Sequence, residues 1–79
     1  MKIPVVKTLV ENYTLEQLQK AEDAILEEQK PEIEIGGDDE GEQLTHIYGA
    51  KWILEQMAKG DEFKAALRAF TQRVRDSIS

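Results

Sequence analysis

The stretch from Glu42 to Ile78 constrains the fold most, because it reads as two amphipathic helices joined by one short turn. Apolar residues return every three or four positions on both sides of Gly60. A glycine is typical of the position just after a helix, and the aspartate that follows it is typical of a cap for the next helix. We therefore predict helices over residues 42–59 and 62–77, packed as an antiparallel or steeply crossed hairpin.

The predicted hairpin also holds the best candidates for a contact surface. Gly49 lies inside a helix, where it costs about 1 kcal/mol relative to alanine, so we expect it to allow close approach of a neighbouring helix. Tyr and Trp are residue types that dominate interface anchors, although packing in the core is the alternative explanation for them. The predicted interface comprises Tyr48, Gly49, Trp52, Phe63, Phe70 and Val74.

The first half of the chain predicts two further helices. Thr14, with Gln17 three residues later, fits a capping box at the start of a helix over residues 15–29, which Pro31 would end. Before it, Pro4 suits the first turn of a short helix over residues 4–11. The β-branched residues of Ile3–Val6 leave a short strand as the rival interpretation.

Residues 31–41 are predicted to form an acidic, glycine-rich loop. Ile33 and Ile35 alternate with glutamates, so a brief extended stretch could press both isoleucines onto the core. Gly36 and Gly37 begin a run typical of a mobile turn. The whole chain, residues 1–79, is then a single all-α domain of three to four helices, with a C-terminal helical hairpin and an acidic loop.

The small size of the chain favours self-association. A domain of 79 residues buries only about 60% of the surface that its unfolded chain exposes. The sequence has no cysteine, so neither a disulfide nor a thiolate metal site can add stability. A second copy of the chain is the remaining source of buried surface, which predicts a homodimer.

Charge is distributed unevenly along the sequence. Residues 1–46 hold 12 acids and 4 bases, whereas residues 47–79 hold 4 acids and 6 bases. This field argues against nucleic-acid or anionic-membrane binding, which needs clustered lysines and arginines. A modest basic patch near the end of the chain is interpreted as a solvated face or as a partner for the acidic segment of another copy; its members are Lys64, Arg68, Arg73 and Arg75.

No catalytic motif is present, and we do not expect an enzyme or a cofactor. His46 is the one histidine, and its expected place is a solvent-facing or capping position. A metal site would need it to converge with the carboxylates of Asp38, Asp39 and Glu42, and the EF-hand order of ligands is absent. With no apolar run long enough to span a membrane and no signal peptide pattern, a cytoplasmic protein is expected.

Three segments resemble a family of short uncharacterised bacterial proteins. These are the opening Met-Lys-Ile-Pro-Val-Val-Lys, the Ile47-Tyr48-Gly49-Ala50 segment, and the closing Phe70-Thr71-Gln72-Arg73-Val74. The resemblance does not extend to the acidic loop. It implies a helical domain of unknown function and transfers no active site.

Two functional hypotheses follow from the sequence. The leading one is a non-enzymatic protein–protein interaction module that associates with itself, or with another protein, through the helices of residues 42–59 and 62–77. The alternative is an accessory protein that binds a small ligand or a metal ion through His46 and the acidic loop.

Overall fold

The structure is a computed structural model that describes the backbone of residues 2–78 and the side chains of residues 2–76. It contains four helices, α1 (Ile3–Asn12), α2 (Leu15–Leu26), α3 (Glu40–Ala58) and α4 (Phe63–Ile78). No strand occurs in the described part of the chain. The predicted all-α fold is confirmed, and so is the helical interpretation of the segment after Lys2.

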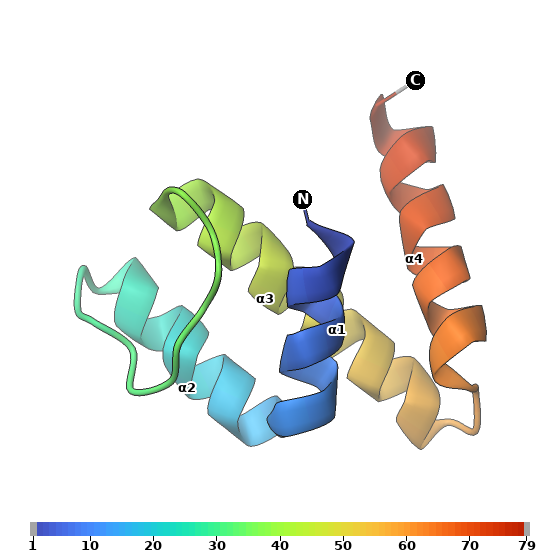
Figure 1. The fold of residues 1–79 in the computed structure, drawn as a ribbon, viewed down its shortest axis with the longest axis horizontal. Coiled ribbons are helices and arrows are strands. Elements are labelled where there is room, and N and C mark those ends of the chain that lie inside the picture. Colours follow the sequence, from blue (N-terminus) through green and yellow to red (C-terminus); the bar gives the residue numbers. More distant parts are fainter. Residues whose placement is uncertain (1, 79) are drawn as a thin grey trace.

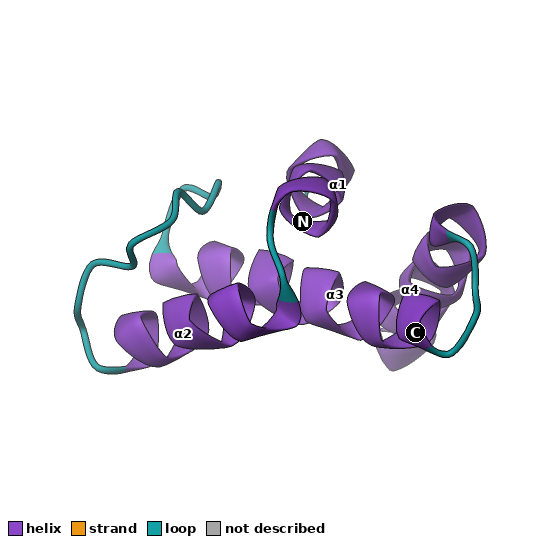
Figure 2. Cartoon of the chain, turned by 90° about the horizontal axis from the view of Figure 1, so that it is seen from below, coloured by secondary structure: helices purple, strands orange, loops and turns teal. Residues whose placement is uncertain are grey.

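Helix α3 lies at the centre, and each of the other helices packs mainly against it. Helices α2, α3 and α4 form a layer, and α1 crosses one side of it together with the long loop (Figure 2). Helix α4 is steeply inclined to α3, as the short turn predicts (Figure 1). The buried apolar core draws on all four helices and the loop: Val6, Leu9, Val10, Leu18, Ala21, Ile25, Ile35, Ile47, Ala50, Ile53, Ala66 and Phe70.

The predicted capping box of α2 is confirmed. The Gln17 amide donates to the Thr14 hydroxyl, and the Thr14 amide donates to the Gln17 side chain. These two hydrogen bonds satisfy backbone groups that the first turn of a helix leaves without partners.

Helix α2 ends three residues earlier than predicted. The chain turns back at Glu28, whose φ is +60°, and its amide bonds to the Ile25 carbonyl while the Gln29 amide bonds to the Ala24 carbonyl. This pair of bonds is a Schellman motif, which stops the helix before Pro31 can. The end of α3 has the same two bonds, and there the residue with positive φ is Gly60, as predicted.

Helix α3 begins at Glu40, two residues before the predicted start. Asp39 caps it, because its side chain accepts a hydrogen bond of 2.8 Å from the Glu42 amide. The acidic residues at this start face the positive end of the helix, where negative charge is favourable. In the loop before it, Ile35 is buried and Ile33 is half-buried against the core, as the alternating pattern predicts.

Candidate functional site

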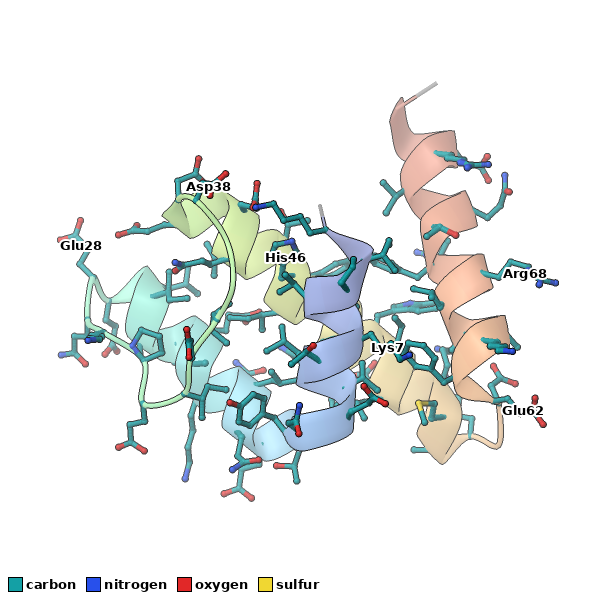
Figure 3. All side chains as sticks on the ribbon, in the orientation of Figure 1. Lys7, Glu28, Asp38, His46, Glu62 and Arg68 are labelled. Carbon is teal, nitrogen blue, oxygen red and sulfur yellow. The ribbon has the colours of Figure 1, made fainter. Side chains whose placement is uncertain are left out.

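His46 is fully buried, so the expectation of a solvent-facing or capping histidine is wrong. Its side chain lies between the start of α1 and the loop (Figure 3). The Lys2 backbone amide donates to Nε2 at 2.9 Å, and Nδ1 lies 2.6 Å from the Gly36 carbonyl oxygen. The ring therefore joins three segments that are far apart in the sequence.

These two partners define the protonation of the ring. A backbone amide can only donate, so Nε2 is the acceptor, and a carbonyl can only accept, so Nδ1 carries the hydrogen. This is the neutral imidazole with its proton on Nδ1. Both nitrogens are occupied by the protein's own backbone, which leaves His46 without a free lone pair for a metal ion.

The carboxylates that were candidate metal ligands already have partners within the chain. Asp39 caps α3, while Asp38 and Glu42 each lie 3.8 Å from the Lys2 ammonium group. Within residues 2–76, no group of three His, Cys, Asp or Glu side chains is placed to hold a metal ion. These contacts hold Lys2, at the start of α1, against the acidic loop. We call the contacts of Lys2 and His46 with Gly36, Asp38 and Glu42 the clasp.

The two glycines of the loop complete this clasp. A Cβ on Gly36 would lie 3.0 Å from both methyl groups of Val5, so glycine lets the loop approach α1 closely. Gly37 has φ +148°, a conformation that other residues rarely adopt, and a Cβ there would meet the Gln43 backbone. The segment expected to be a mobile turn is thus packed against α1 and α3.

Two of the six predicted interface residues are used inside the chain. Gly49 and Phe70 are buried against each other, and a Cβ on Gly49 would lie 2.9 Å from the Phe70 ring. The predicted close helix approach at Gly49 is therefore the contact between α3 and α4. Phe63 and Val74 are half-buried against the same core.

Tyr48 and Trp52 form the exposed edge of that contact. Their ring centroids lie 6.1 Å and 5.9 Å from the Phe70 centroid, in tilted arrangements that favour aromatic pairs. Tyr48 is 56% exposed, and the Arg73 guanidinium lies 5.6 Å from the Trp52 ring centroid. We call Tyr48, Trp52 and Arg73 the aromatic patch.

The aromatic patch lies at the edge of the contact between α3 and α4. Residues two positions apart in an α-helix point in directions that differ by about 200° around the helix axis. Tyr48 therefore points almost opposite to His46, whose side chain is part of the clasp. Lys51, one turn further on, turns towards α2 and pairs with Glu22 at 3.4 Å. Figure 2 shows α1 and the loop together on one side of the helix layer.

The sequence indicated only the basic residues of a second surface, a groove between α1 and α4. Its lining residues come from both ends of the chain: Ile3, Lys64, Leu67, Arg68 and Thr71. No local pattern reveals such a site, because the two helices are brought together only by their shared partner α3.

No helix of the described residues is long and apolar enough to cross a membrane.

The comparisons with known proteins give a family and no activity. The model of a family of unknown function, DUF6952, matches residues 1–79, and the chain belongs to this family. Neither the curated proteins nor the solved structures yield a match. The resemblance to a family without an assigned function is confirmed.

Proposed function

Since its family has no assigned function, we propose from the surface of the molecule that the protein is a non-enzymatic interaction module that associates with a second copy through the aromatic patch. The observation that carries this proposal is the exposure of Tyr48 beside Trp52 at the edge of the contact between α3 and α4. Aromatic and arginine side chains are enriched among the residues that contribute most binding energy at protein interfaces.

The geometry of the patch supports a role in binding. Phe70 and Gly49 pack the two helices together beneath it, so the exposed Tyr48 ring and the half-buried Trp52 ring rest on a packed base. A side chain that is already held in place loses less conformational entropy when a partner covers it. Tyrosine also combines an apolar ring with a hydroxyl that can stay hydrogen-bonded at the rim of an interface.

The same patch on two copies can meet across a twofold axis. In such an interface each residue contacts its counterpart or a fixed partner on the other copy, and the assembly closes at two. Arg73 already lies over the Trp52 ring of its own chain, so the patch presents this guanidinium and the exposed Tyr48 ring together to the second copy.

Sedimentation velocity across a range of concentrations tests the proposal. We expect reversible dimerisation by the natural chain, and we expect Tyr48→Ala to weaken it at least tenfold, since loss of an interface anchor costs about 2 kcal/mol. Glu11→Ala is the matched control, because Glu11 is exposed on α1, on the other side of the layer. A natural chain that stays monomeric at every concentration, or equal dimerisation by both variants, contradicts the proposal.

A further inference from the structure

The groove between α1 and α4 is an apolar hollow with basic edges. Ile3 and Leu67, both half-buried, line it together with Thr71, and its volume is about 310 Å³. Lys64 and Arg68 stand at its edge, one turn apart on α4. A cavity of about 150 Å³ already accepts a ligand as large as benzene, so the groove has room for a leucine side chain.

A third cation lies near the groove, on α1. Lys7 follows Ile3 by four residues and so lies on the same face of that helix. Figure 3 shows Lys7 between α1 and α4 and Arg68 extending from α4 into solvent. Within the described residues, Lys7, Lys64 and Arg68 form no ion pair. The groove is thus lined by two basic residues without ion pairs, with Lys7 nearby, on a chain whose net charge is −6.

The far end of the molecule carries the complementary feature. Leu26, the last residue of α2, is 63% exposed. The carboxylates of Asp23, one turn before it, and of Glu27, directly after it, are exposed as well. An exposed apolar side chain beside two carboxylates is complementary to an apolar groove lined by Lys64 and Arg68, in both polarity and charge.

From this match we infer that the groove between α1 and α4 binds the Leu26 end of α2 from a second copy of the chain. Leu26 enters the hollow over Ile3 and Leu67. The carboxylates of Asp23 and Glu27 then face the cations of Lys64 and Arg68.

A single chain cannot make this contact within itself. Glu28, two residues beyond Leu26, and Arg68 lie at opposite ends of the molecule (Figure 3), whose longest extent is 32 Å. The acidic loop of another copy is a poorer occupant, because Ile33 and Ile35 are packed into its own core and Asp38 pairs with Lys2. The end of α2 is the acidic segment that still offers a free apolar side chain.

This contact joins two different surfaces, so it has a direction. A head-to-tail contact leaves one groove and one α2 end free at the two ends of each pair, and further copies can be added until a ring closes. The contact does not depend on the aromatic patch, which faces another side of the molecule. It therefore adds a second mode of association to the proposed function.

Charge reversal in the full-length chain tests the inference. All proteins carry Tyr48→Ala, which removes the aromatic patch from the comparison. One variant reverses the groove with Lys64→Glu and Arg68→Glu, and the other reverses the α2 end with Asp23→Lys and Glu27→Lys. Two of these changes are favourable for helix stability. Lys64→Glu places an acid near the start of α4, and Glu27→Lys places a base at the end of α2, and both charges interact favourably with the helix dipole.

Sedimentation velocity of each variant alone and of their equimolar mixture gives the answer. Each variant alone carries like charges on both surfaces, so we expect its association to be at least about tenfold weaker than that of the Tyr48→Ala parent. In the mixture opposite charges meet again, and association returns. It is also lost in about 1 M salt, where the screening length is about 3 Å.

Three results overturn the inference: a parent that is monomeric at every concentration, a reversed variant that associates like the parent, and a mixture that stays monomeric. Circular dichroism of each variant shows whether it is folded. A monomeric parent beside a natural chain that dimerises overturns the groove contact alone and leaves the aromatic patch in place. If the natural chain and the Tyr48→Ala parent associate equally well, the result contradicts the aromatic patch and leaves the groove contact in place.

Discussion

Helix α3 is attached to its partners in two different ways. At His46, one buried ring hydrogen-bonds the backbone before α1 and the backbone of the loop. At Gly49, the Phe70 ring of α4 rests directly on the helix backbone, in an apolar contact. The first attachment joins three segments through two directional bonds, and the second joins two helices through one large buried side chain.

The apolar attachment contributes more to the free energy of folding, whereas the polar attachment fixes the relative positions of the segments that it joins. Burying a phenylalanine contributes more free energy than a neutral hydrogen bond, because the bond replaces one made with water. A hydrogen bond requires a defined distance and direction, so the His46 bridge fixes where Lys2 and Gly36 lie. Helix α4 relies on apolar contact with α3, whereas α1 and the loop are also held by polar bonds.

The largest effect is expected where α4 meets α3. Phe70→Ala removes the ring from Gly49 and leaves a cavity, so we expect the free energy of unfolding to fall by about 3–5 kcal/mol. Denaturant unfolding measures it. Native-state hydrogen exchange sharpens the result, because amides of α4 should lose more protection than amides of α2. A loss below about 1 kcal/mol would mean that Phe70 is not the main attachment of α4.

An intermediate effect is expected at the polar attachment. His46→Leu keeps an apolar side chain of useful size but leaves the Lys2 amide and the Gly36 carbonyl without their partner. We expect a loss of about 1–3 kcal/mol, the cost of partly buried polar groups without hydrogen bonds. Exchange should quicken in α1 and leave α4 unchanged, which is the reverse of the Phe70 variant. Thr45→Ala, one residue away at an exposed position, is the control and should cost less.

The smallest effect is a gain, at the end of α2. The same Schellman motif ends α2 with Glu28 and α3 with Gly60, and both residues have positive φ. Glu28→Gly should raise the free energy of unfolding by about 0.5–1 kcal/mol, because the left-handed conformation costs a side-chain-bearing residue about 1 kcal/mol. Gln29→Gly, at the next position, is the control and should give no gain. Equal effects of the two changes would show that the strain at Glu28 is negligible.

The sequence predicted the helices because their signals are local. The Thr14 cap, the Gly60 turn and the spacing of Phe63, Leu67 and Phe70 lie within a few residues of the structure that they specify. The early end of α2 was missed because Pro31 is a strong helix terminator in sequence, whereas a Schellman turn with glutamate at the left-handed position has no sequence signal. The early start of α3 was missed because Asp39 is one of several adjacent acids that could serve as caps.

The candidate site depended on contacts that no local pattern contains. The sequence correctly indicated Gly49 as a close approach and identified Tyr48 and Trp52 as interaction candidates. It could not show that Phe70 is buried against Gly49 while Tyr48 is exposed, since Phe70 belongs to one apolar stripe and Tyr48 flanks the other. The burial of His46 depends on Lys2 and on the loop, and a histidine among acidic residues is ordinarily a surface residue.

The His46 bridge also bears on the order in which the molecule folds. It joins residues 44 positions apart, whereas Gly49 and Phe70 are 21 positions apart and connected by a short turn. Closing a longer loop costs more conformational entropy, and local contacts form sooner than distant ones. The pairing of α3 with α4 is therefore favoured as an early event, and the docking of α1 through the Lys2 amide as a late one. The two hydrogen bonds of His46 are then complete only after both the start of the chain and the loop have docked on α3.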